Sequence, residues 1–114
     1  MKVLYKSKKL EKLCNDERKL ISEYGKEVAT KLIAVINLLE SAYNLKDILA
    51  FTQYRLHLLK GKYDGLFSMR LGSTTGFRLI IMPLDENENI VKNSTNVYTV
   101  TVNVEIVEVS KHYE

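Results

Sequence analysis

The sequence predicts an α+β fold in which two helices pack on one face of a mostly antiparallel sheet. Apolar residues recur with helical spacing in the first part of the chain, whereas short β-type runs separated by glycine-containing turns follow residue 46. Helices followed by a meander of strands are typical of α+β proteins. With 114 residues and a hydrophobic fraction of 46%, the chain can bury its own core, and we expect a single domain over residues 1–114.

The N-terminal part is expected to hold a short strand over residues 2–6 and then a helix from Ser7 to Cys14, with the serine as its cap. A second helix over residues 17–43 is the strongest periodic signal in the chain. Gly25 lies inside it and costs about 1 kcal/mol relative to alanine, which need not break the helix. The apolar stripe of this helix consists of Ile21, Tyr24, Val28, Leu32, Val35, Leu39 and Ala42.

The remaining residues predict a four-stranded sheet. Runs of alternating or β-branched residues indicate the strands, and clusters of glycine and polar residues indicate the turns between them. Pro83 is expected to end the third of these strands, and a polar loop follows it. The expected strands cover residues 53–60, 66–71, 77–82 and 97–109, with turns at 61–65 and 72–76.

Composition excludes several classes of protein. The single cysteine, Cys14, rules out an intramolecular disulfide and a site of several thiolates. Apolar runs such as residues 32–36 are too short to span a bilayer, and no apolar segment of the secretory type follows the first residues. We therefore expect a cytoplasmic protein with no membrane partner. With two histidines and no phosphate-binding glycine loop, we expect no metal and no cofactor.

Charge is divided unevenly along the chain. Residues 1–62 contain thirteen Lys or Arg and seven Asp or Glu, a balance of +6, whereas residues 63–114 have a balance of −3. A basic half attracts phosphate groups or an acidic partner. The alternative is a solvated helix surface with spare lysines.

Two arginines flank the predicted turn over residues 72–76. If that turn is symmetric, Arg70 faces Arg78 across the hairpin. Two guanidinium groups directly opposite each other repel, and a bound anion would remove that cost and use their fork geometry. Alternatively, each arginine reaches water or pairs with Glu105 or Glu108 on a neighbouring strand.

A histidine and a lysine lie on the strand before this hairpin. His57 is two residues from Arg55 and shares its strand face, and an imidazole can give or take a proton near neutral pH. Lys60 would point to the opposite face of a regular strand, so it shares a site with His57 only if the chain turns there. The alternatives are a structural histidine and an ordinary surface lysine.

The C-terminal segment gathers acidic, basic and phenolic side chains. Lys111, His112 and Tyr113 follow the last predicted strand and are candidates to lie over the edge of the sheet. The alternative is a frayed terminus without a role.

Four ordered segments resemble the HigB branch of the RelE/ParE toxin superfamily. Its pattern contains a Leu-His-x-Leu-Lys-Gly strand, a Ser-x-Arg strand, an aromatic-Arg-Ile strand and a C-terminal strand that ends near a histidine. The resemblance covers residues 54–112, and it implies a RelE-like fold, with an N-terminal short strand and two helices packed on a four-stranded sheet. The matching segments are residues 56–61, 68–71, 77–80 and 104–107.

The resemblance implies the toxin of a type II toxin–antitoxin pair. Such toxins are ribosome-dependent endoribonucleases (mRNA interferases) that cut messenger RNA and stop translation. The implied partners are the ribosome, its messenger RNA and an antitoxin of the HigA-like, helix-turn-helix type, which alone contacts operator DNA. No metal or cofactor takes part, because the ribose 2′-hydroxyl attacks the adjacent phosphorus.

The resemblance also assigns roles to particular residues. His57 is implied in proton transfer and Lys60 as a base or electrostatic group, while Arg70 and Arg78 are implied as the phosphate clamp. The family pattern ends in Asp-Tyr-His directly after the last strand, where this chain has residues 108–110, Glu-Val-Ser. His112 and Tyr113, displaced from that position, are the candidates for the terminal group.

Two other functions stay open at this point. A ParE-like gyrase inhibitor has the same fold without ribonuclease chemistry, and a non-catalytic binding module would have no toxicity. His57, Lys60 and the C-terminal histidine and tyrosine favour the ribonuclease.

Overall fold

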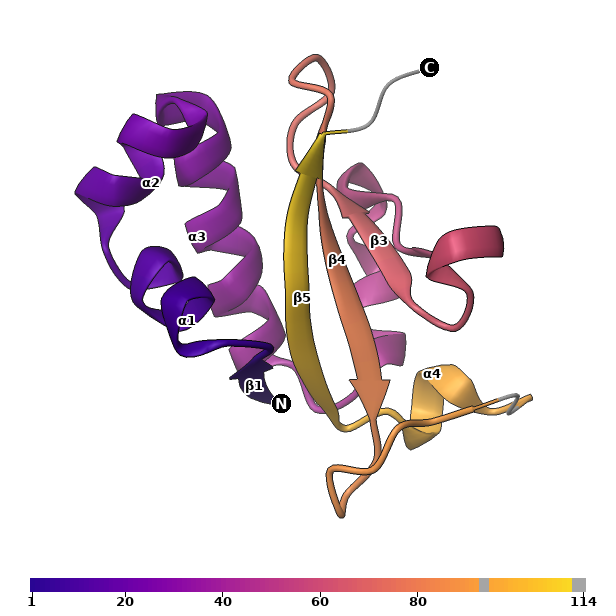
Figure 1. Ribbon diagram of the computed structural model, residues 1–114. Helices are drawn as coiled ribbons and strands as arrows, with labels where there is room; N and C mark the ends of the chain where they lie inside the picture. The colour runs from indigo at the N-terminus through magenta and orange to yellow at the C-terminus, as the bar shows by residue number, and fades with distance from the viewer. Residues whose placement is uncertain (93–94, 112–114) are drawn as a thin grey trace.

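A five-stranded, mostly antiparallel sheet forms the centre of the α+β fold in the computed structural model, which describes residues 1–92 and 95–111 (Figure 1). Two short 3₁₀ helices, η1 (Leu45–Ala50) and η2 (Thr52–Tyr54), connect the helical part to the hairpins, and a third, η3 (Gly61–Tyr63), lies between β2 and β3. The other elements are β1 (Lys2–Tyr5), α1 (Lys8–Cys14), α2 (Glu17–Tyr24), α3 (Lys26–Ser41), β2 (His57–Leu58), β3 (Phe67–Arg70), β4 (Phe77–Leu84), α4 (Val97–Val100) and β5 (Asn103–Lys111).

The strands are arranged in the order β1-β5-β4-β3-β2. β1 pairs in parallel with β5, with Val3 opposite Val104, and all other neighbours are antiparallel. The N-terminal strand is therefore a fifth strand of the sheet rather than a separate element beside four strands. The α+β class predicted from the sequence is confirmed.

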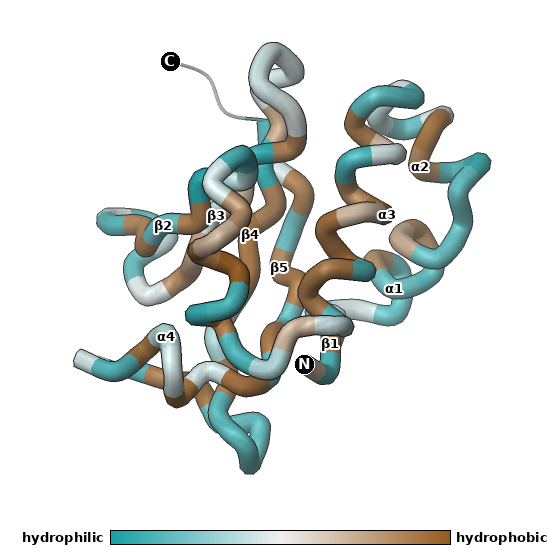
Figure 2. The backbone as a smooth tube through the Cα atoms, turned by 180° about the vertical axis from the view of Figure 1, so that it is seen from behind, coloured by the Kyte–Doolittle hydropathy of each residue, from teal (hydrophilic) through white to brown (hydrophobic). Residues whose placement is uncertain are grey.

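Helices α1, α2 and α3 lie together on one side of this sheet (Figure 1). Figure 2 shows hydrophobic residues concentrated along α3 and the central strands β4 and β5. Burying these side chains supplies the main driving force for the fold, at about 25 cal/mol per Å² of apolar surface. The core joins Val28, Ala29, Leu32, Val35, Ile36 and Leu39 of α3 to Met69, Leu71, Leu79, Ile81, Val104 and Ile106 of the sheet.

The helical region differs from the sequence prediction at one residue. The start of α1 agrees, because the Ser7 side chain accepts a hydrogen bond from the Leu10 N–H at 3.1 Å. The predicted single helix over residues 17–43 is wrong, since Gly25 divides it into α2 and α3. Gly25 has φ 87° and ψ 163°, a backbone conformation open essentially only to glycine.

Three strand predictions also change. The expected strand over residues 53–60 is reduced to β2, because Arg55 takes a left-handed conformation at φ 47° and ψ 50°. The expected strand over residues 97–109 begins only at Asn103, after the short helix α4. Pro83 lies inside β4 instead of ending it. The Pro83 carbonyl accepts a hydrogen bond from the Val91 N–H on the edge of β4 that faces away from β5. β3 has already ended on that edge, so no neighbouring strand there requires an N–H from residue 83.

A β-bulge in β5 determines which side chains face the helices. Ile80 lies opposite Glu108 and Ile81 opposite Ile106, so Val107 is an extra residue on β5. The bulge places Ile106 and Val109 on the helix-covered face although they are three residues apart. It also leaves Glu108 on the opposite face, together with Arg78.

Within residues 1–92 and 95–111, the longest helices fall short of the length and apolar character needed to cross a bilayer.

The substitution Gly25→Ala tests the division of the helix. In one continuous helix, alanine would stabilise the protein by about 1 kcal/mol. At the observed φ and ψ it should instead destabilise by about 1–3 kcal/mol, although a methyl group there meets no atom within 4 Å. Urea unfolding measures the sign of the change in the free energy of unfolding. Ser22→Ala, on the exposed surface of α2, is the control. A more stable Gly25→Ala protein would contradict the break.

Candidate anion-binding site

The hairpin between β3 and β4 places two arginines opposite each other. Arg70 pairs with Arg78 in the antiparallel register, as the symmetric turn predicts. The Leu71 N–H donates to the Phe77 carbonyl at 3.0 Å and closes the turn. Thr75 fixes it further, since its hydroxyl donates to the Leu71 carbonyl at 2.6 Å and accepts from the Phe77 N–H at 3.1 Å. The facing backbone positions of the two arginines are therefore set by the register of the hairpin.

Alternation along the two strands turns both arginines away from the helices. Met69 and Leu71 flank Arg70 and are fully buried against the helical layer. Leu79 follows Arg78 and is buried in the same core. Successive side chains of a strand point to opposite faces, so both arginines lie on the open face of the sheet.

A pocket of about 470 Å³ joins these arginines to the strand before them. Arg55, His57, Arg70 and Arg78 line it, and none of the residues found to line it is acidic. Neither Arg70 nor Arg78 forms an ion pair with any carboxylate of the described chain, where Lys2 and Glu88 make the one ion pair. The Arg78 Nε is buried without a hydrogen-bond partner among those residues. The pocket therefore has the charge and the free donors to bind an anion.

His57 lies in this pocket in a defined orientation. It pairs with Ser68 across β2 and β3, on the same face as the two arginines. Its Nδ1 is 2.6 Å from the Arg55 carbonyl oxygen. Because a carbonyl oxygen can only accept, Nδ1 carries the hydrogen in this contact. The other ring nitrogen, Nε2, is then left to accept or donate a proton.

Two residues of the site were missed in the sequence analysis. Arg55 lines the pocket, and its left-handed backbone carries the carbonyl that holds His57. No glycine or asparagine marks that turn in the sequence. Tyr63, in η3, has its ring centre 5.5 Å from the Arg78 guanidinium carbon. That distance corresponds to a cation–π contact, which orients the arginine.

Tyr63 also connects the site to β5. Its hydroxyl is hydrogen-bonded to Glu108, and this bond is the main reason why the pKa of Tyr63 lies above its ordinary value. A hydrogen bond from the neutral phenol to a carboxylate favours the protonated form. Ser110, opposite Arg78 in the register, also bonds the hydroxyl. The glutamate considered as a partner for the arginines is therefore engaged by Tyr63.

The other predicted site residues lie at the margin of the pocket or beyond the described chain. Lys60 is exposed where the chain turns into η3, and it is not among the residues that line the pocket. Lys111 ends β5 with its Nζ 5.3 Å from the centre of the Phe77 ring. His112 and Tyr113 lie outside the described residues.

In the described part of the chain, no three His, Cys, Asp or Glu side chains are grouped so that they could hold a metal ion. Cys14 is buried in the helical layer, where loss of hydration raises the pKa of its thiol to about 11. A thiol with that pKa stays protonated at neutral pH and is a poor nucleophile.

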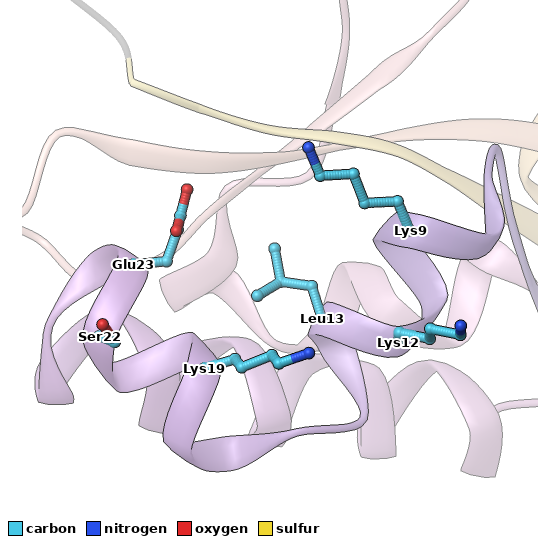
Figure 3. Close-up of a pocket in the computed structure, with 6 residues that line it drawn as sticks. All are labelled: Lys9, Lys12, Leu13, Lys19, Ser22 and Glu23. Atoms are coloured by element: carbon cyan, nitrogen blue, oxygen red, sulfur yellow. The ribbon is translucent and has the colours of Figure 1, made fainter.

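A second basic region lies on the helical layer. A pocket of about 290 Å³ separates α1 from α2 (Figure 3). Lys9, Lys12 and Lys19 line it around the half-buried Leu13, and Glu23 is its one carboxylate. It differs from the arginine pocket in that its charges are exposed lysines on flexible stems.

Comparison of the chain with protein-family models, curated protein sequences and solved structures finds no match. The function is therefore inferred from the chemistry of the arginine pocket and from the resemblance in sequence.

Inorganic phosphate should stabilise the folded protein, because it relieves the repulsion between Arg70 and Arg78. A ligand at ten times its Kd, bound only by the folded state, adds about 1.4 kcal/mol to the free energy of unfolding. Comparing the melting temperature in phosphate and in chloride of equal ionic strength measures the stabilisation that is specific to phosphate. Arg70→Gln should remove most of this phosphate-specific stabilisation. An equal rise in the melting temperature in both salts would show that no phosphate binds here.

Proposed function

We propose that this protein is a toxin of a type II toxin–antitoxin system with a RelE-like fold, and that it acts as an mRNA interferase on the ribosome. The observation that carries the proposal is the pair of facing guanidinium groups, without carboxylate partners among the described residues, in one pocket with His57. Cations that meet at one point suit the phosphorane formed during RNA cleavage. A histidine with one nitrogen fixed suits proton transfer.

The reaction is a transesterification within the RNA strand. The ribose O2′ forms a bond to the adjacent phosphorus, and the bond from phosphorus to O5′ of the next nucleotide breaks. The products are a 2′,3′-cyclic phosphate and a 5′-hydroxyl, once a base has taken the 2′ proton and an acid has protonated O5′. His57 Nε2 transfers one of these protons. Arg70 and Arg78 hold the charge on the phosphoryl oxygens, so the chemistry needs no metal or cofactor.

Three further residues keep the roles that the sequence predicts for them. Lys60 is proposed as an electrostatic group or base that approaches the substrate from the turn before η3. His112 and Tyr113 are proposed for the second proton transfer. On the ribosome, ribosomal RNA would supply much of the positioning, so a deep groove for free RNA is not required.

The second candidate is a ParE-like gyrase inhibitor, and the third is a non-catalytic binding module. The orientation of His57 toward the arginine pocket favours the ribonuclease, because a gyrase inhibitor or a binding module needs no free imidazole nitrogen beside an anion clamp. Reconstituted translation, followed by mapping of the 5′ ends of the messenger RNA, separates the ribonuclease from the others. A gyrase supercoiling assay identifies the second candidate, and normal bacterial growth during expression identifies the third.

The proposed partner in the cell is an antitoxin, expected to be a HigA-like helix-turn-helix protein that alone contacts operator DNA. The lysines around the pocket between α1 and α2 support a partner with an acidic segment. Complementary charge speeds association and selects against wrong partners. The proposed place of action is the ribosome in the cytoplasm.

Arg70→Ala should abolish cleavage of messenger RNA more completely than Lys111→Ala. Removing a group that stabilises the transition-state charge costs about 10²–10³ in rate, whereas Lys111 lies over Phe77 and is not among the residues that line the pocket. Growth arrest after induction, at matched protein levels, and cleavage in reconstituted translation are the measurements. An equal loss in both variants would place Lys111 in the site.

Reversing the charge of the lysines around the second pocket should weaken association with the antitoxin. The triple variant Lys9→Glu, Lys12→Glu, Lys19→Glu should mainly slow association, with an effect that shrinks as salt is raised. The measurement is the association rate with the product of the neighbouring gene, which must also rescue growth. The matched control reverses three other exposed lysines, Lys31, Lys46 and Lys92. Equal slowing in both triple variants would exclude a specific role for this pocket.

A further inference from the structure

Arg55 has an unusual backbone for its residue type. Its φ is 47° and its ψ 50°, and among the described residues Glu88 is the other non-glycine with positive φ. Arg55 is exposed, and its N–H closes η2 by donating to the Thr52 carbonyl at 3.1 Å. Asparagine or glycine would adopt this conformation more readily than arginine. Strained backbone of this kind is often found next to functional groups.

The left-handed turn has a direct effect on His57. It directs the Arg55 carbonyl to Nδ1 of the imidazole at 2.6 Å. In a regular extended strand, a residue's carbonyl points sideways toward a neighbouring strand, not toward its own side chains two positions on. The backbone of Arg55 therefore fixes the hydrogen on Nδ1 and leaves Nε2 of this pocket-lining histidine outside that contact.

Arg55 lines the pocket as well, as the third arginine around it. Arg78 is on β4 and Arg70 on β3, while Arg55 lies two residues before the start of the neighbouring strand β2. With strands about 4.8 Å apart, the three backbones extend across about 10 Å. That width and the volume of about 470 Å³ exceed what one phosphate fills, and they suit a ligand of nucleotide size.

We infer that Arg55 has two roles in this site: its backbone is the positioning element for His57, and its guanidinium binds a second phosphate next to the one held by Arg70 and Arg78. The pocket then takes a single-stranded segment with two consecutive phosphates rather than an isolated phosphate. This inference rests on the proposed function, because it names the form of substrate that the same site accepts.

Two variants separate the roles of Arg55. Arg55→Asn removes the guanidinium but keeps a residue that tolerates the left-handed conformation. Arg55→Val removes the guanidinium and also disfavours that conformation, since valine is β-branched. Arg18→Asn, on the exposed surface of α2, is the matched control for the loss of one positive charge far from the pocket.

The backbone role is measured by ¹⁵N NMR of the His57 ring at a pH where it is neutral. Wild type, Arg55→Asn and Arg18→Asn should show Nδ1 carrying the hydrogen. Arg55→Val should shift the population toward the tautomer with hydrogen on Nε2. An unchanged tautomer in a folded Arg55→Val protein overturns the positioning role.

The side-chain role is measured with a 2′-O-methyl trinucleotide, which has two phosphates and cannot be cleaved, and with inorganic phosphate. Arg55→Asn should weaken trinucleotide binding about tenfold while phosphate binding changes less than twofold. The slope of log K against log salt should fall by about 0.7, the value for one lost contact on a single strand. Equal affinity of wild type and Arg55→Asn for the trinucleotide overturns the second phosphate contact.

These readouts do not depend on the proposed reaction. If the trinucleotide and tautomer effects are found but wild type cuts no messenger RNA during translation, the roles of Arg55 stand and the ribonuclease proposal fails. If wild type binds the trinucleotide no more tightly than inorganic phosphate, the two-phosphate inference fails whether or not messenger RNA is cut.

Discussion

The pairing of Arg70 with Arg78 across the β3–β4 hairpin is the constraint on which the site depends. Their position follows from the backbone register, which Thr75 locks from inside the turn. Like charges directly opposite each other on a ladder are destabilising, and neither arginine has a carboxylate partner among the described residues. The buried hydrophobic core on the other face keeps this unfavourable pair in place, because slipping the register would expose Met69 and Leu79. A bound anion would replace the repulsion between the two arginines with favourable charge-assisted hydrogen bonds.

Neighbouring elements hold the arginines and the histidine without neutralising them. Tyr63 lies against the Arg78 guanidinium, and its hydroxyl engages the nearby Glu108. The carboxylate that would otherwise pair with Arg78 is thereby held by a phenol. Arg55 holds His57 in a comparable way, because its carbonyl oxygen contacts Nδ1 at 2.6 Å and fixes the orientation of the ring. In both cases a neutral partner orients the functional group, so its charge or its proton remains for a ligand.

The sequence predicts the parts of this site that follow from local residue patterns. It does not predict the parts that depend on the backbone conformation of a single residue. The facing of Arg70 and Arg78 follows from a turn of known length between two alternating runs. The grouping of His57 with them follows from strand order, because adjacent hairpins place their strands side by side. The break at Gly25 and the turn at Arg55 depend on positive φ values, and an arginine gives no sign of one. Tyr63 was missed because its contacts join η3 to β4 and β5, at Arg78 and at Glu108, which are distant from it in the sequence.

The β-bulge at Val107 affects both the hydrophobic core and the candidate site. Without the extra residue, strict alternation would put Val109 and Ile106 on opposite faces, and one of them would leave the core. With it, β5 keeps both apolar residues against the helices and still directs Glu108 to the face of the arginines. Tyr63 needs Glu108 at that place, and Arg78 lies against Tyr63. The same irregularity that completes the hydrophobic core therefore also places Glu108 beside Tyr63, whose ring lies against the Arg78 guanidinium.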